Sequence, residues 1–221
     1  MSYESFKKWH VHMFNVLGMM VRGIVDSSEL DDLHEKCLLR HNIPLPKSQN
    51  EKSKNLIHFL KIVNNQIQEA NLKLTRTKDD EYPGTKAYLV LVNRNKITGG
   101  SEKCPMLTFK PKELDYLQIL VRKIMHNEMK QISHISALNC VAEMNSKVGK
   151  KETEKLKEAE NMLEKFKKHK WLRFDDANPK IRLSPRFVKE MEPYLRKDFE
   201  QYVADCCVCH SIVIQVIFFV K

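Results

Sequence analysis

The stretch TEKLKEAENMLEKFKKHKWLRFDDANPKIRLSPRFVKEMEPYL, residues 153–195, contains the pattern that decides the fold. Apolar residues recur through its first part at three- and four-residue steps: Leu156, Ala159, Leu163 and Phe166. This period predicts a long helix from about Thr153 to His169. WLRF and IRLS are β-prone and flank the turn sequence DDANPK, so a β-hairpin should follow the helix.

A further helix is expected directly after the hairpin. Ser184 suits its N-cap and Pro185 its first position, while Pro193 should kink or divide it. Upstream, Pro111 suits the first turn of another helix with an apolar stripe, and a short helix is expected over roughly Ser136 to Asn145. The sequence of the second half therefore predicts three helices followed by a β-hairpin.

The first half repeats this order. An amphipathic segment, residues 6–24, precedes DSSELDDLHEKCLLRH, whose serines can cap a second helix. A third helix is expected from about Ser53 to Ala70. LKLTR and AYLVLV then predict two strands joined by the turn sequence DDEYPGTK.

Helix, helix, helix and hairpin, occurring twice, is the layout of tandem winged-helix domains. The predicted class is mainly α with small β-hairpins, that is, α+β. The expected boundaries are a first domain over 1–95, a linker over 96–105, a second domain over 106–203 and a C-terminal segment over 204–221.

The net charge of +10 permits contact with nucleic acid or with an acidic partner. In a winged-helix protein the lysine-rich helix near 153–169 could enter a major groove. Alternatively, its lysines and glutamates are i,i+4 partners on a solvated face, and base readout more often uses Arg, Asn or Gln. The N-terminus has no apolar core of a signal peptide, and no run reaches roughly 18 apolar residues, so no membrane span is expected.

Cysteines carry the one motif with specific chemistry. Cys206-x-x-Cys209 has the spacing of a zinc knuckle, because thiolates three residues apart can face one tetrahedral ion. Cys207 and His210 are candidate additional ligands, but no second pair follows, and two free cysteines are the alternative. No nucleophile–base pair or phosphate-binding glycine loop is recognisable, so no catalytic or cofactor-binding residue is assigned, and a metal-dependent enzyme of another class remains only a third hypothesis.

Three segments carry a family resemblance: EKLKEAENMLEKFKKHKWL, RLSPRFVKEMEPYLR and CCVCHSIVIQ. They resemble the non-SMC element one subunit of the SMC five–six complex. The resemblance implies two winged-helix domains and a C-terminal variant RING domain that binds zinc. It also implies MAGE-type and kleisin partners, a nuclear, chromosome-associated role in DNA repair and recombination, and ubiquitin ligase activity with a ubiquitin-conjugating enzyme. A free-standing winged-helix DNA-binding regulator is the alternative.

The C-terminal segment departs from the family pattern. A RING of this kind needs eight ligands, and only Cys206 and Cys209 match, because VIFFVK contains neither Cys nor His. We therefore expect 204–221 to be the remnant of a truncated RING that does not fold or hold zinc stably, and the chain to be inactive as a ligase on its own. SIVIQVIFFV should be exposed, or else pack back on the second domain; deletion of 211–221 is expected to raise solubility without loss of fold.

Overall fold

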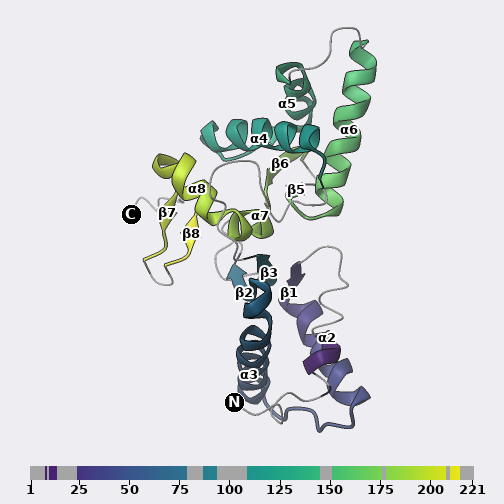
Figure 1. Cartoon of the computed structure of the whole chain (residues 1–221), viewed down its shortest axis with the longest axis vertical. Helices are drawn as coiled ribbons and strands as arrows, with labels where there is room; N and C mark the ends of the chain where they lie inside the picture. The colour runs from purple at the N-terminus through teal and green to yellow at the C-terminus, as the bar shows by residue number, and fades with distance from the viewer. Residues whose placement is uncertain are drawn as a thin grey trace. The chain divides into compact units, whose positions relative to one another are not determined.

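The computed structural model describes residues 8, 10–13, 24–78, 87–93, 109–144, 151–175, 178–207 and 210–214. In this part of the chain the architecture is mostly helical with small antiparallel sheets, so the α+β prediction is confirmed (Figure 1). The chain divides into two compact units, Met1–Arg94 and Asn95–Lys221. The predicted linker, 96–105, lies outside the described residues.

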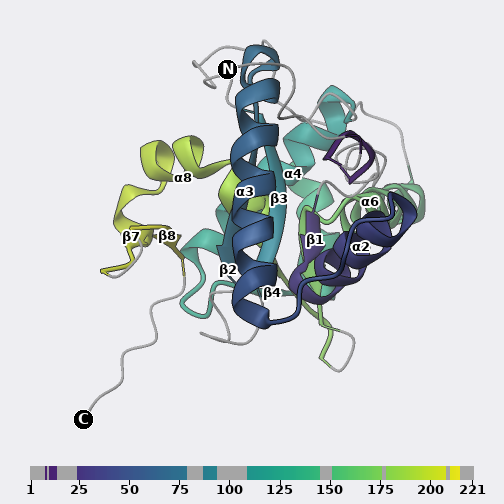
Figure 2. The ribbon, with the colours of Figure 1, turned by 90° about the horizontal axis from the view of Figure 1, so that it is seen from below.

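In the first unit, α2 and α3 pack against a three-stranded sheet. Its elements are β1 (Ile24–Asp26), α2 (Ser27–Arg40), α3 (Gln49–Ile67), η2 (Gln68–Ala70), β2 (Leu72–Lys78) and β3 (Ala87–Asn93). The strand order is β1-β3-β2, all antiparallel, with α3 against β2 and α2 beside β1 (Figures 1 and 2). The sheet therefore contains a strand, β1, that the sequence did not predict.

Asp26, and not a serine, caps α2. Its carboxylate accepts a hydrogen bond from the Glu29 N–H at 2.8 Å, so the predicted serine cap is wrong. The two serines at 27 and 28 already lie inside the helix. Asp is as good an N-cap as Ser, and the residue one position earlier takes the role because it still has extended backbone angles.

The core of the first unit lies between α2, α3 and the sheet. The Asn64 side chain also fastens α3 to β2: its amide donates to the Leu74 carbonyl at 2.9 Å and accepts from the Leu74 N–H at 2.7 Å. Most of the predicted first helix lies outside the described residues. Residues 10–13 are helical, and Met13 is fully buried in this core.

The second unit follows the predicted order more closely. Its elements are α4 (Pro111–His126), β4 (Ile132–Ser133), α5 (His134–Asn139), η3 (Cys140–Glu143), α6 (Glu152–Lys168), β5 (Leu172–Phe174), β6 (Lys180–Leu183), α7 (Pro185–Glu190), α8 (Glu192–Asp198), η4 (Glu200–Tyr202), β7 (Ala204–Asp205) and β8 (Ile212–Val213). One sheet has the order β4-β6-β5, and β7 pairs with β8. The long helix, the hairpin, the Pro111 start and the division of the last helix at Pro193 are confirmed.

Aromatic side chains fill the core where α6 meets β5. Trp171, at this junction, is 1% exposed, and its ring lies 5.8 Å from Phe109 and 5.5 Å from Phe187 between centroids, both edge-on. Across α4 and α6, the Lys165 ammonium lies 2.7 Å from the Glu113 carboxylate. This core makes α4, α6 and α7 one packed body, on which the C-terminal elements rest.

Ser184 joins two parts of this body. Its hydroxyl accepts from the Phe187 N–H at 3.1 Å, as an N-cap should, and donates to the Lys170 carbonyl at 2.5 Å. The side chain thus satisfies two backbone groups in a place where water has little access, since Ser184 is 4% exposed. The predicted cap at Ser184 is confirmed.

Replacing Ser184 with alanine is expected to lower the free energy of unfolding by about 1–2 kcal/mol, because a buried N–H and a partly buried carbonyl both lose their partner. Urea denaturation measures the change. Ser133→Ala is the matched control: Ser133 caps α5 through the Ser136 N–H but is exposed, so water can replace it. If Ser184→Ala lost no more unfolding free energy than Ser133→Ala, burial would not be what makes the Ser184 hydrogen bonds stabilising.

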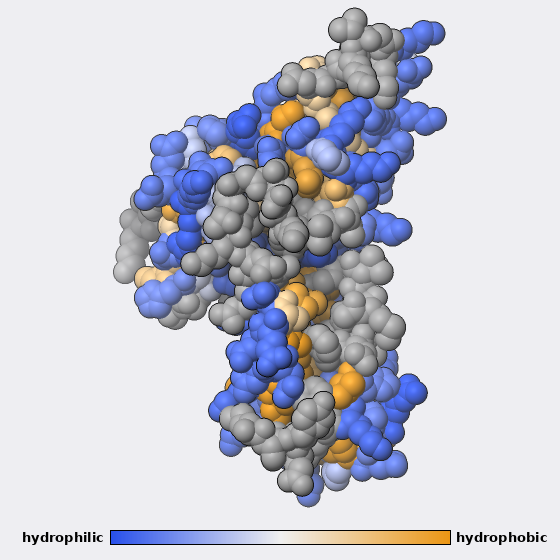
Figure 3. Space-filling view, viewed as in Figure 1, coloured by the Kyte–Doolittle hydropathy of each residue, from blue (hydrophilic) through white to orange (hydrophobic). Residues whose placement is uncertain are grey.

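On the face shown in Figure 3, hydrophilic residues cover much of the described surface, and apolar residues appear in patches among them. Among the described helices, none combines the length and the hydropathy that crossing a membrane requires.

Candidate metal centre

Cys206 begins the turn that joins β7 to β8. Asp205 pairs with Ile212 and Ala204 with Val213 in the strands below it. In the turn, the Cys206 N–H donates to the Ser211 carbonyl and the His210 N–H donates to the Cys206 carbonyl, both at 2.9 Å. His210 has the left-handed backbone angle φ 53° that reverses the chain. Both backbone polar groups of Cys206 are therefore bound within the turn.

The donors of this turn are only partly described. Cys206 is half-buried, whereas Cys207 and His210 are exposed. Cys209, the predicted partner ligand, lies outside the described residues. Among the described residues, no three His, Cys, Asp or Glu side chains gather where they could hold an ion. The described donors thus do not form a closed four-coordinate zinc site, and the pair Cys206–Cys209 stays a prediction.

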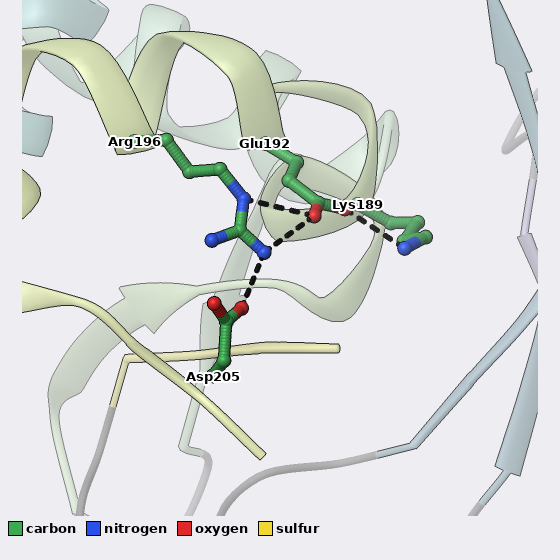
Figure 4. Close-up of polar contacts among 4 residues, drawn as sticks. All are labelled: Lys189, Glu192, Arg196 and Asp205. Carbon is green, nitrogen blue, oxygen red and sulfur yellow. Dashed lines mark hydrogen bonds and ion pairs between the residues drawn. The ribbon is translucent and has the colours of Figure 1, made fainter. Parts of the chain in front are cut away.

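A polar network from α7 and α8 holds the strand before Cys206 (Figure 4). Arg196 donates to the Glu192 carboxylate at 3.1 and 2.9 Å and to the Asp205 carboxylate at 2.6 Å. Lys189 donates to the same Glu192 at 2.8 Å. Burial alone would raise the pKa of Glu192, but these hydrogen bonds outweigh burial and lower it; the Arg196 hydrogen bond likewise lowers the pKa of Asp205.

Two isoleucines anchor the other strand. Ile212 is 3% exposed and Ile214 6% exposed, and both belong to the core of the second unit together with Leu195 and Phe199. The expectation that this segment is exposed is therefore wrong at these positions, and packing onto the second unit is what the structure shows. The expectation of an unfolded remnant is also wrong for 204–207 and 210–214, which form a paired hairpin. Residues 215–221 lie outside the described residues.

Two cysteines far from this turn, Cys37 and Cys140, are structural. Cys37 and Cys140 are buried, and burial raises the pKa of both thiols, so they stay protonated and unreactive at neutral pH. The Cys140 thiol donates to the Ser136 carbonyl. Cys104 lies outside the described residues.

The exposed face of α6 carries both signs of charge. Its exposed side chains are Glu152, Thr153, Glu154, Lys157, Asn161, Glu164 and Lys168. The basic residues concentrate in the last turn, where cations favour the helix dipole, and Lys165 there is bound to Glu113. This arrangement favours the interpretation of α6 as a solvated or protein-facing helix over one that reads bases.

Comparisons with known proteins agree with the resemblance seen in the sequence. Residues 17–191 match the family model described as "Nse1 non-SMC component of SMC5-6 complex". A relative from Xenopus tropicalis, "Non-structural maintenance of chromosomes element 1 homolog", is 30% identical over 214 residues, covering 96% of this chain and 71% of the relative. The human protein of the same name is 27% identical over 199 residues, covering 89% of this chain and 67% of its own.

Among solved structures, the fold is similar to a chain of an "Nse1-Nse3-Nse4 complex". The TM-score is 0.73 at 23% identity, and the likeness covers 95% of this chain and 82% of that chain. At this identity the likeness shows the fold. Because the family model matches most of this chain, residues 17–191, the chain belongs to the Nse1 family of non-SMC components of the SMC5-6 complex.

Proposed function

We propose that this chain acts as a docking subunit of the SMC5-6 complex and binds a MAGE-type Nse3 subunit and a kleisin-type Nse4 subunit. The observation that carries the proposal is the family match over residues 17–191. The fold likeness to a chain from a complex of Nse1 with Nse3 and Nse4 supports it, because that likeness extends over 95% of this chain.

Both units are proposed to be winged-helix domains. Each of the two three-stranded antiparallel sheets ends in a hairpin, β2–β3 in the first unit and β5–β6 in the second. Each hairpin comes after a long helix, α3 or α6. In winged-helix proteins that bind DNA, the recognition helix enters the major groove. The mixed lysine and glutamate face of α6 supports a protein partner for the second unit.

The biological role follows from the complex. We propose that the chain serves DNA repair and recombination in the nucleus, on chromosomes, as the family resemblance implies. A RING-type ubiquitin ligase activity with a conjugating enzyme requires zinc ligands beyond Cys206 and Cys209. We therefore propose docking as the function that the family match supports best.

Co-purification with Nse3- and Nse4-type subunits tests the docking role. We expect a stable complex with one copy of each subunit that survives about 0.5 M salt, because a partner interface with an apolar centre is little screened. Size-exclusion chromatography with light scattering measures it. The double variant Cys206→Ser, Cys209→Ser is the control and should bind equally well. Failure to form the complex, or loss of it in the double variant, would contradict docking independent of the cysteines.

Nucleic-acid binding is the second candidate, favoured by the net charge of +10. Binding through several phosphates would weaken steeply between about 50 and 200 mM salt. A fluorescence-anisotropy titration with duplex DNA at both salt concentrations distinguishes the two functions. Tight, salt-sensitive binding by the chain without its partners would favour this candidate over docking.

A further inference from the structure

We propose that the cysteine hairpin, described at residues 204–207 and 210–214, is folded by its contacts with the rest of the second unit and not by a metal ion, with Arg196 as the residue that positions it. The proposal goes beyond docking and does not depend on it. Small zinc-binding modules commonly gain their folding free energy from the metal, so that the protein without metal is unfolded. The contacts of this hairpin point to a different source.

The first source is apolar packing. The side chains of Ile212 and Ile214 enter the core that also contains Leu195 of α8 and Phe199, which follows α8. Burying an isoleucine side chain stabilises the folded state whether or not an ion is present. Ile212, in β8, and Ile214, directly after β8, are therefore both held by the core of the second unit.

The second source is the fork of Arg196. Its guanidinium reaches Glu192, one helical turn earlier on α8, and Asp205 on β7 at the same time. Lys189 holds Glu192 from the other side, so the carboxylate that orients Arg196 is itself oriented (Figure 4). Asp205 directly precedes Cys206. The network therefore fixes the strand that leads into the cysteine turn.

The turn itself closes with backbone hydrogen bonds. The bond from Cys206 to Ser211 and that from His210 to Cys206 need no side-chain ligand. A metal ion or a partner that reaches Cys206 therefore meets a residue whose backbone hydrogen bonds are already made. Contacts with the rest of the second unit have already ordered this backbone, so binding loses little free energy to the conformational entropy of the hairpin.

Amide hydrogen exchange of the whole 221-residue chain, followed by NMR at the amides of Cys206 and His210, tests the proposal. We expect their protection to change less than twofold when a zinc chelator is added, and less than twofold in the double variant Cys206→Ser, Cys209→Ser. Loss of protection in either experiment would show that metal folds the hairpin and would overturn the proposal.

The Arg196→Ala variant tests the positioning residue. Because its ion pairs are half-exposed, we expect exchange at Cys206 to become about twofold to fivefold faster. Lys197→Ala, at the exposed next position on α8, is the matched control and should leave exchange unchanged. Arg196→Lys, which keeps the charge but loses the fork, should fall between the two. Equal exchange in Arg196→Ala and Lys197→Ala would refute the role of Arg196.

Discussion

Replacing Ile212 with alanine is expected to lower the free energy of unfolding of the second unit by about 2–5 kcal/mol. Ile212 is 3% exposed and belongs to the same core as Trp171 and Phe187, so truncation leaves a cavity that the surrounding core fills only in part. Urea denaturation, monitored by intrinsic fluorescence, measures the loss of stability, because the fluorescence of the buried Trp171 reports on this core.

Val213→Ala is the control for Ile212→Ala. Val213 is the neighbouring residue of β8 but only half-buried, so its truncation should cost clearly less. Deletion of 211–221 removes both buried isoleucines and is now expected to destabilise the chain, contrary to the sequence-based expectation that the fold would not suffer. An unchanged unfolding midpoint in Ile212→Ala would show that the hairpin does not pack on the second unit.

The helices were predictable because their signals are local. The apolar stripe of α6, the proline at the start of α4 and the cap at Ser184 each depend on residues within one or two turns of each other. The missed elements are those that exist only through pairing. β1 and β4 have three and two residues, too few for an alternating pattern, and they are strands because β3 and β6 bind them.

The same division holds at the cysteine hairpin. The Cys206-x-x-Cys209 spacing is local and visible in the sequence, and so is the i,i+4 pair Glu192–Arg196. Asp205, which also binds Arg196, lies nine residues later in a different element, β7, so no local sequence pattern predicts that the two side chains meet. SIVIQVIFFV is apolar at nearly every position, and such a run has no period that shows which side chains face a core.

Replacing Arg186 with leucine is expected to destabilise the second unit strongly, because this arginine is mostly buried. Arg186 stands between the buried Glu190, 3.3 Å from its carboxylate, and the His169 carbonyl at the end of α6, to which it donates at 2.6 Å. Its guanidinium also lies over the Trp171 ring at 5.2 Å. Glu190 is 5% exposed, so losing Arg186 leaves a buried carboxylate without its cation, at an expected cost of about 3–5 kcal/mol near neutral pH.

The cost should depend on pH in a defined direction. Burial raises the pKa of Glu190 even with Arg186 present. Between the ordinary glutamate pKa and this raised value, the folded chain binds more protons than the unfolded chain. The stabilisation from Glu190 is therefore complete below the ordinary pKa and is lost as pH rises through the raised one. The charge and the hydrogen bond of Arg186 both lower the pKa of Glu190. Without Arg186 this pKa is higher, so the pH range over which stability falls extends to higher pH.

Urea midpoints measured from about pH 4 to about pH 8 should therefore fall more steeply with pH in Arg186→Leu than in the parent chain. Adding Glu190→Gln to Arg186→Leu removes the titrating group, so it should flatten the profile and restore part of the stability at neutral pH. The part not restored measures the lost bond to the His169 carbonyl together with the lost contact over the Trp171 ring, neither of which a change at Glu190 can replace. If the double variant kept the steep profile, the pH dependence would have to originate at another group, and the buried pair would not be what Arg186 stabilises.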